Sequence, residues 1–201
     1  MGSWEVMPIT IRQRKIILGL LLGDGHLEKN GRYVRLRIDQ RLNHKDYVYW
    51  LYGELANLVP GKPRIIRETD RRTQKTYSRL HFSTYSLKEF EEWRNNFYVN
   101  RKKIIPPNIE NILKSPVSLA IWLMDDGYKR NDCAAIRLNT DAFNYDEQNI
   151  LIQCLQKNFK IKSHLHKKGK WFNIYIPQGE AKKFSRLVKP YILPSFRHKL
   201  L

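Results

Sequence analysis

Two segments of the chain are hydrophobic on every side of a helix and end in acidic residues. Residues 118–127 read SLAIWLMDDG, and residues 16–25 read IILGLLLGDG. A helix that is apolar all round is covered by protein on every side, so both segments are predicted to be core helices. Gly127 is expected to cap the second helix in the left-handed conformation.

The acidic ends of these helices break a local rule. A helix C-terminus already carries partial negative charge and favours cations, yet Asp125 and Asp126 stand at the end of one helix and Asp24 at the end of the other. A local rule broken without visible compensation suggests a functional site. A bound divalent cation is the simplest missing partner.

The segments between the two apolar helices show strand and helix periodicity in turn. Val34, Leu36 and Ile38 alternate with polar, mostly basic residues, which predicts a strand with one apolar and one basic face. Asn30-Gly31 and Lys168-Gly169 are predicted hairpin turns. Each half therefore reads helix, two strands, helix, two strands, helix. The predicted strands are 26–29, 33–41, 64–67, 77–84, 127–130, 135–140, 161–167 and 171–177, and the other helices are 44–58, 87–98, 145–159 and 179–188.

The repeat divides the chain into two halves with a connection between them. We predict a first half of residues 1–99, a second half of residues 118–201, and a linker at 100–117 that contains a short helix. The segment NRKKIIPP in the linker has the prolines and exposed charge of a connecting segment.

Charge points to a polyanionic partner. The 201 residues include 37 Lys and Arg against 19 Asp and Glu, a formal charge of +18, and nucleic acid is the first candidate. The longest apolar run is too short to cross a bilayer. Cys133 and Cys154 form no disulfide framework, and the N-terminus lacks a signal-peptide core. We therefore expect an intracellular protein, in a prokaryotic cytoplasm or an organelle matrix.

Both apolar motifs resemble the sequence that names the LAGLIDADG homing endonucleases. Asp24 and Asp126 match its last Asp, and Gly25 and Gly127 its last Gly. Two copies on one chain resemble the monomeric, intron-encoded members. The resemblance implies an α+β fold of two pseudo-symmetric αββαββα halves, each with a four-stranded antiparallel sheet, which together form a DNA-binding saddle. The first motif departs from the pattern at Leu22, Gly23 and a missing first acid.

The same resemblance implies that the two motif helices pack side by side. Gly19 and Ala120 suit this contact, because small residues let helix backbones approach closely. Asp24 and Asp126 would then meet, and two adjacent carboxylates repel unless a cation or proton lies between them. Oxygen ligands of this kind suit Mg²⁺, and we assign the backbone of Gly23 and Asp125 to the same metal site.

Two lysines lie at similar distances after the motif aspartates. Lys103 and Lys199 follow Asp24 and Asp126 by 79 and 73 residues. Both segments resemble those that supply an active-site lysine in monomeric members of the family. The predicted catalytic residues are therefore Asp24, Asp126, Lys103 and Lys199, and the implied chemistry is metal-dependent phosphodiester hydrolysis.

Outward positions of the predicted strands supply candidates for reading DNA. Arg pairs with guanine and Asn with adenine in the major groove, while other contacts reach only phosphate. If each half follows about one helical turn, the double-stranded target spans roughly 20 base pairs. The candidates are Arg35, Arg37, Arg41, Arg67, Arg79, His81, Arg137, Asn139, Lys162, His164, His166, Asn173 and Tyr175.

Alternative functions stay open on the same scaffold. One is an intron maturase that binds RNA, and another is a DNA-binding regulator without catalysis. Retention of both aspartates and both lysines favours the enzyme, since a binding module needs none of the four. A zinc site of His164, His166 and Cys133 is disfavoured, because no second cysteine has ligand spacing.

Overall fold

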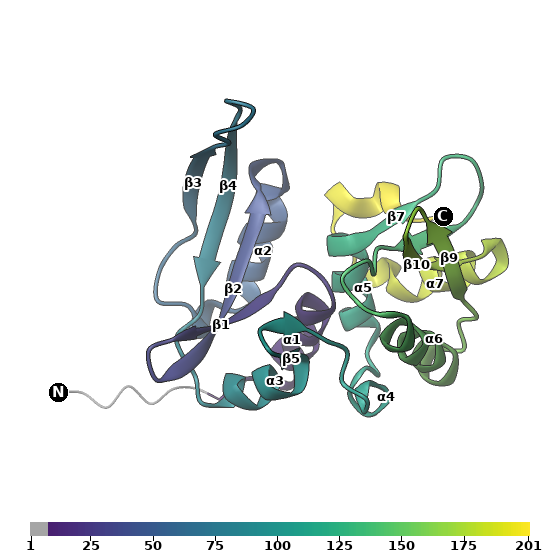
Figure 1. Cartoon of the computed structure of the whole chain (residues 1–201), viewed down its shortest axis with the longest axis horizontal. Coiled ribbons are helices and arrows are strands. Elements are labelled where there is room, and N and C mark those ends of the chain that lie inside the picture. Colours follow the sequence, from purple (N-terminus) through teal and green to yellow (C-terminus); the bar gives the residue numbers. More distant parts are fainter. Residues whose placement is uncertain (1–7) are drawn as a thin grey trace. The chain divides into compact units, whose positions relative to one another are not determined.

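The computed structural model describes residues 8–201, which pack as two compact units (Figure 1). Unit 1 comprises the chain up to Arg14 together with Asp24–Glu92, and unit 2 comprises Lys15–Gly23 together with Trp93–Leu201. Packing therefore groups the end of the first motif helix with the second half of the chain. No helix in residues 8–201 is long and apolar enough to cross a membrane.

Unit 1 contains a four-stranded antiparallel sheet in the order β1-β2-β4-β3. The alternation predicted for the second strand is present, since Val34, Leu36 and Ile38 are each at most 3% exposed. Tyr47, Val48 and Leu51 form the buried side of a helix in the same unit. The elements are β1 (His26–Asn30), β2 (Tyr33–Arg41), η1 (Leu42–His44), α2 (Lys45–Glu54), η2 (Ala56–Leu58), β3 (Arg64–Thr69), β4 (Thr76–Ser83) and the start of α3 (Glu89–Phe97).

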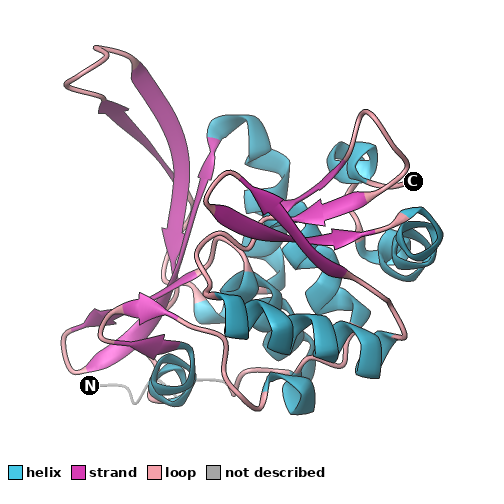
Figure 2. Cartoon of the chain, turned by 45° about the vertical axis from the view of Figure 1, so that its right-hand side comes forward, coloured by secondary structure: helices cyan, strands magenta, loops and turns pink. Residues whose placement is uncertain are grey.

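Unit 2 holds a second sheet of the same topology, in the order β7-β8-β10-β9. Helices cover one face of this sheet (Figure 2). Its longest helix, α6, runs from Tyr145 to Phe159 as predicted, and Asn144 and Glu147 close a capping box at its start. The elements are β7 (Gly127–Lys129), β8 (Ile136–Leu138), α6 (Tyr145–Phe159), β9 (His164–Lys168), β10 (Trp171–Ile176), α7 (Gln178–Val188), η3 (Lys189–Tyr191) and η4 (Pro194–Lys199).

The two motif helices are α1 (Ile11–Leu22) and α5 (Pro116–Asp126). Within unit 2 they pack closely at Gly19, where an added Cβ would lie 2.5 Å from Cβ of Ile121 and 2.6 Å from the Ser118 carbonyl oxygen. Ser118 also donates its hydroxyl to the Lys15 carbonyl at 2.7 Å. The predicted close contact at Gly19 is confirmed.

The two halves have the predicted element order. The first is α1-β1-β2-α2-β3-β4-α3, and the second is α5-β7-β8-α6-β9-β10-α7. The prediction of an α+β fold with two αββαββα halves is therefore confirmed.

Three local predictions were wrong. Gly127 has φ −91° and ψ 156°, which is extended and not left-handed. Position 127 needs glycine for a different reason, because an added Cβ would lie 2.8 Å from the Leu123 carbonyl oxygen. Both hairpin turns lie one residue later than predicted: Asn30 pairs with Tyr33 and Lys168 with Trp171, so Gly31 and Gly169 take the first loop position with φ near 60°.

The predicted linker also contains structure of its own. A two-residue hairpin joins β5 (Tyr98–Val99) to β6 (Lys102–Lys103), and α4 (Ile109–Ile112) follows. Asn100 and Arg101 form the hairpin loop with φ of 48° and 67°. Positive φ at both loop residues matches the twist of a tight hairpin, and this hairpin places Lys103.

Candidate active site and sheet faces

The C-terminal ends of the motif helices meet at Gly23 and Asp125. A Cβ added to Gly23 would lie 2.5 Å from Cβ of Asp125 and 2.9 Å from its carboxyl carbon. Glycine at position 23 therefore permits the close approach of the Asp125 side chain, although it departs from the family motif. Gly23 and Asp125 are the two residues whose backbone was predicted to bind metal. Both belong to unit 2 and lie in contact there.

Each motif helix ends against a lysine from a distant segment. The Lys103 ammonium donates to the Gly23 carbonyl at 2.7 Å. The Lys199 ammonium donates to the Met124 carbonyl at 2.6 Å and to that of Leu123 at 3.2 Å. Both lysines thus donate to carbonyls near the last turn of a motif helix, where carbonyls lack a helical partner, although the Leu123 carbonyl also accepts from the Gly127 backbone N–H. These two ammonium groups therefore offset part of the negative charge at the acidic C-terminal ends of the motif helices.

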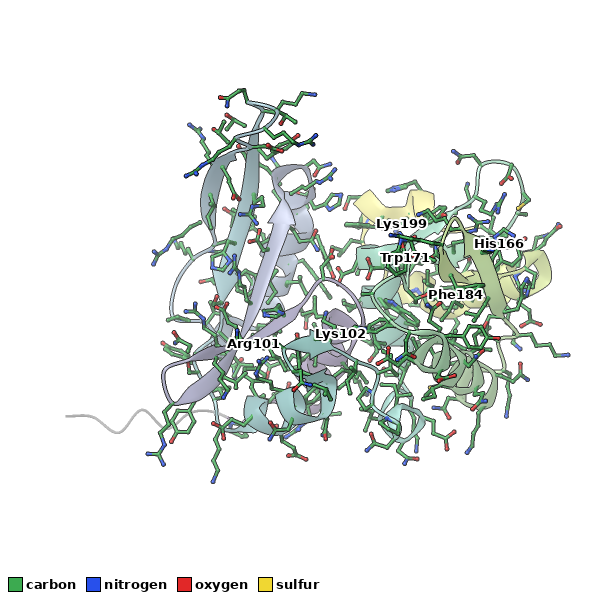
Figure 3. All side chains as sticks on the ribbon, viewed as in Figure 1. Arg101, Lys102, His166, Trp171, Phe184 and Lys199 are labelled. Carbon is green, nitrogen blue, oxygen red and sulfur yellow. The ribbon has the colours of Figure 1, made fainter. Side chains whose placement is uncertain are left out.

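Rigid surroundings hold both lysines. Lys103 ends the β5–β6 hairpin, whose register pairs Tyr98 with Lys103. Lys199 ends η4 in the C-terminal segment (Figure 3), and its ammonium lies 5.1 Å from the ring centroid of Phe196, a residue that is 2% exposed. These contacts hold both ammonium groups at the ends of the motif helices.

Asp24 belongs to unit 1, where Gln40 holds its carboxylate. Gln40 donates from Nε2 to Oδ2 of Asp24 at 2.8 Å, and its Oε1 lies 3.4 Å from Nδ1 of His44. Gln40 is only 7% exposed. The sequence analysis did not single out Gln40, although a glutamine that continues the buried series Val34, Leu36 and Ile38 is an available signal.

The oxygen donors at the helix ends suit a hard divalent cation. Carboxylates and backbone carbonyls are the ligands that Mg²⁺ and similar ions take, with waters completing the set. In residues 8–201 no three His, Cys, Asp or Glu side chains gather as a metal-binding group. The carboxylates and carbonyls at these helix ends are donors of the type that such an ion accepts.

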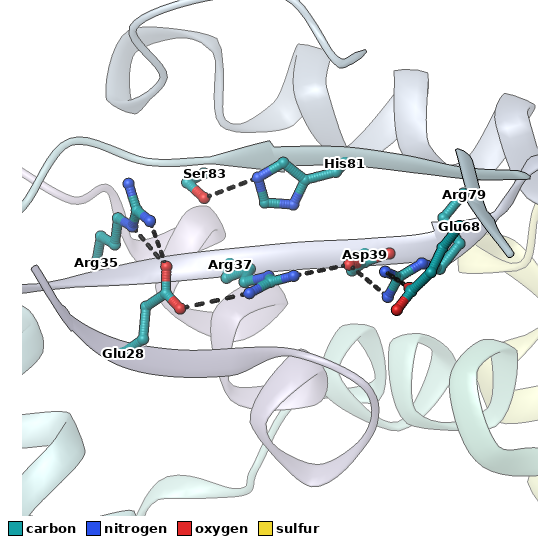
Figure 4. A network of polar contacts seen from close by, with 8 residues as sticks. All are labelled: Glu28, Arg35, Arg37, Asp39, Glu68, Arg79, His81 and Ser83. Carbon is teal, nitrogen blue, oxygen red and sulfur yellow. Dashed lines mark hydrogen bonds and ion pairs between the residues drawn. The ribbon is translucent and has the colours of Figure 1, made fainter. Parts of the chain in front are cut away.

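The outward face of the unit 1 sheet carries six charged side chains in one network (Figure 4). Arg35, Arg37 and Arg79 pair with three carboxylates that the sequence analysis did not single out, Glu28, Asp39 and Glu68. Burial opposes ionisation of Glu28, but Arg35 and Arg37 outweigh it and lower the pKa of this carboxyl. The hydrogen bond to Asp39 raises the pKa of Arg37.

His81 lies on the same face, opposite Asp39. Burial lowers the pKa of His81, and the positive charge of Arg37 lowers it further. Its Nε2 lies 3.4 Å from the Ser83 hydroxyl. His81 is thus disposed to stay neutral beside the arginines.

The corresponding face of unit 2 is organised around Tyr175. The guanidinium carbons of Arg130 and Arg137 each lie 6.0 Å from its ring centroid, and the His164 and His166 rings lie at 5.0 and 5.4 Å. Arg137 also contacts His166 and donates to the Tyr128 hydroxyl at 3.4 Å. Trp171 is half exposed on the same β9–β10 hairpin (Figure 3). Cations and aromatic rings therefore share this face, as suits contact with nucleic acid.

Three of the predicted DNA-reading residues are placed differently by the structure. Arg67 pairs with Ser78 and so lies on the sheet face opposite to Arg79. The β3 residue that shares a face with Arg79 is Ile66. Lys162 precedes β9, and its backbone N–H donates to Glu180 at 3.0 Å. Asn173 is completely buried, with its amide 3.2 Å from Oδ1 of Asn139. Arg67 and Lys162 are therefore not outward strand residues of the kind predicted, whereas Asn173 pairs with His166 and shares its face but has a buried side chain.

The remaining ten candidates lie on or next to the two outward faces. Cross-strand pairs share a face of an antiparallel sheet, which groups Arg37 with Ser83 and Arg137 with Tyr175. The ten are Arg35, Arg37, Arg41, Arg79, His81, Arg137, Asn139, His164, His166 and Tyr175.

These features are those of a two-motif nuclease fold, and the sequence agrees. Residues 14–184 match the LAGLIDADG DNA endonuclease family, so the chain belongs to this family. The family predicted from the motifs is therefore confirmed.

Individual relatives of the chain include both endonucleases and maturases. The cytochrome b mRNA maturase bI2 of Debaryomyces hansenii is 33% identical, over 96% of this chain and 75% of that protein. The DNA endonuclease I-ChuI of Chlamydomonas applanata is 28% identical, over 96% of each chain. This chain spans about half (49%) of the related maturase bI2 of Saccharomyces cerevisiae.

The fold also matches a solved structure along nearly its whole length. The homing endonuclease I-WcaI, bound to its DNA recognition sequence, has a TM-score of 0.89 and 27% identity, covering 97% of this chain and 88% of that one. A structure of I-DmoI in complex with DNA and Mn shares the fold at 16% identity and a TM-score of 0.50.

Proposed function

We propose that this chain is a site-specific endonuclease that hydrolyses phosphodiester bonds at a long, asymmetric double-stranded DNA target of roughly 20 base pairs. One observation carries the proposal: each motif helix has a lysine at its C-terminal carbonyls and an aspartate at its last residue or two residues beyond it. A protein that only binds DNA needs neither lysine in that place. Family membership and the likeness to DNA-bound I-WcaI support the same conclusion.

In this proposal Asp24 and Asp126 hold divalent metal, with the backbone of Gly23 and Asp125. The close packing of Gly23 on Asp125 supports the pairing, because the two aspartates are the next residues along the chain. Mg²⁺ is the ion we propose, and when bound it supplies a Lewis acid and an activated water for an in-line displacement. Gln40 orients the Asp24 carboxylate through its hydrogen bond.

Lys103 and Lys199 are proposed to act at the phosphate. Fixed ammonium groups stabilise the negative charge that develops on phosphate oxygens in the transition state, at no cost of reorganisation. Their bonds to the helix carbonyls support this role, since each leaves an ammonium next to the end of a motif helix. The proposed enzyme works as a monomer, because one chain carries both motifs.

The proposal is tested by cleavage of a library of randomised duplexes about 20 base pairs long, followed by sequencing of the products. The reaction is run with Mg²⁺, with Mn²⁺ and with EDTA. One asymmetric consensus that is cut only with metal supports the proposal. Absence of cutting by a folded protein that still retains DNA would move the assignment to a non-catalytic DNA-binding regulator.

The maturase relatives favour a second candidate function, binding of structured intron RNA. An RNA role does not need the aspartates. Selection of bound RNAs from a structured transcript pool, with double-stranded DNA and tRNA as competitors, tests it. Retention of specific RNA by the variant Asp126→Asn would support a separate RNA activity, and loss of all RNA to the tRNA competitor would exclude it.

A further inference from the structure

The charged network on the unit 1 sheet face is an unbroken alternating series (Figure 4). Arg35 donates from Nε to Glu28 at 2.7 Å, and Nη1 of Arg37 lies 3.6 Å from the other oxygen of Glu28. Asp39 then accepts from Arg37 at 3.0 Å and from Arg79 at 3.1 Å. Arg79 reaches Glu68 at 2.5 Å. Three arginines and three carboxylates thus share one face.

This arrangement is unexpected on a surface for a polyanion. The whole chain carries a formal charge of +18, yet the network contributes three positive and three negative charges and is neutral. Non-specific affinity for DNA grows with the number of phosphates that Lys and Arg neutralise. The three arginines are therefore poorly suited to act as general phosphate contacts while these pairs persist.

They are better suited to reading base edges. A guanidinium has five N–H donors in a rigid plane, more than these ion pairs engage. An arginine held in position presents its other donors to O6 and N7 of guanine, the commonest specific contact in the major groove. Asp39 bridges two arginines and thereby fixes the orientation of both.

Unit 2 provides an internal comparison. Arg137 lies opposite Tyr128 and Tyr175, as Arg37 lies opposite His26 and Ser83. Counting two residues on from each arginine places Asn139 where unit 1 has Asp39. The guanidinium of Arg137 contacts Tyr128 and His166, and within residues 8–201 it forms no ion pair with a carboxylate. The neutral network is therefore a property of unit 1 alone among the two described sheets.

We propose that Glu28, Asp39 and Glu68 are specificity-determining positioning residues of unit 1. They hold Arg35, Arg37 and Arg79 as base-reading groups and restrain them from binding phosphate indiscriminately. The unit 1 half-site is then read with higher fidelity and weaker salt dependence than the unit 2 half-site. This inference rests on the proposed function, site-specific recognition of DNA.

The test is Asp39→Asn, which removes the shared charge, keeps the side-chain shape and copies Asn139. Affinity for random-sequence duplex is expected to rise, with the slope of log K against log salt steeper by about 0.9 for each new phosphate contact. Discrimination against single substitutions in the unit 1 half-site is expected to fall about tenfold for each released arginine. Unit 2 half-site discrimination is expected to stay at the wild-type level.

Asp132→Asn is the matched control, because Asp132 also pairs with an arginine, Arg130, but in the β7–β8 connection of unit 2. It should leave discrimination in the unit 1 half-site unchanged. If Asp39→Asn folds and binds but keeps both the wild-type salt slope and wild-type discrimination, the inference is overturned while the proposed function stands. A wild-type protein that neither binds nor cuts any duplex specifically would overturn the proposed function itself.

Discussion

The ammonium group of Lys199 lies 2.6 Å from the carbonyl oxygen of Met124, in the last turn of the second motif helix. A similar contact in the first motif joins Lys103 to the Gly23 carbonyl at 2.7 Å, one position further along the motif, since Gly23 aligns with Asp125. The two lysines reach the same place from different structures, a 3₁₀ segment and a two-residue hairpin. The two halves therefore share an ammonium group at the C-terminal end of the motif helix, although different structures supply it.

Lys199→Met and Lys103→Met should each reduce cleavage by about 100-fold or more, because each removes a fixed positive charge at the phosphate. Stability should fall by only about 1 kcal/mol, the scale of a cation at a helix C-terminus. The measurement is single-turnover cleavage of the selected target, with thermal unfolding in parallel.

Lys102→Met is the matched control for the first of these variants. Lys102 is exposed and lies next to Lys103 on the same hairpin. It should cut at close to the wild-type rate. Equal losses in Lys102→Met and Lys103→Met would show that general basic charge, and not the placed ammonium, accounts for the effect.

Asp24→Asn and Asp126→Asn should each lower the cleavage rate by about 100-fold or more. Both variants should keep most of the specific DNA binding. The reason is that each removes a proposed metal ligand without removing a DNA-reading side chain. Gel-shift affinity and cleavage are measured on the same duplex.

Asp125→Asn provides the neighbouring comparison, since only the backbone of Asp125 is proposed to bind metal. It should retain metal-dependent cutting. Full activity in Asp126→Asn would remove the metal assignment altogether.

Gly19→Ala should destabilise the protein by roughly 1–3 kcal/mol, the range for overpacking a tight contact. The added methyl group would meet Ile121 and the Ser118 carbonyl, and the backbone carbonyl cannot move aside cheaply. Gly53→Ala is the control, because Gly53 is also helical but nothing lies within 4 Å of its added Cβ. That variant should gain about 0.5–1 kcal/mol from helix propensity. Equal effects of the two variants, measured by denaturant unfolding, would contradict the packing.

His81 should make unit 1 less stable in mild acid. Its pKa is lowered in the folded state, chiefly by burial, so below about pH 6.5, the ordinary value of histidine, the unfolded chain binds the proton more readily. Stability is therefore complete above that pH and declines as the pH falls toward the folded pKa. Thermal unfolding between pH 7.5 and 5 should show a smaller decline for His81→Asn than for wild type.

Sequence alone determined the elements and the family. The apolar runs at residues 16–22 and 119–124 predicted buried helices, and the alternation of Val34, Leu36 and Ile38 predicted a strand with one buried face. Helix α6 was predicted from Tyr145 to Phe159 without error. These features are local. Side chains return to the same face every 3.6 residues in a helix and every two residues in a strand, so a short stretch of sequence shows which face is buried.

Tertiary structure alone decided which of the polar residues work together. Whether Arg67 or Ile66 shares a face with Arg79 depends on register, and a shift of one residue exchanges the two faces. Three carboxylates, those of Glu28, Asp39 and Glu68, pair with arginines, and Lys103 pairs with Gly23. Most of these contacts join residues that are 7 to 80 positions apart, and the contact of Asp39 with Arg37 joins neighbours on one strand face. Such contacts are fixed by how elements pack and not by local periodicity, because a charged residue exposed to water satisfies the pattern equally well with or without its partner.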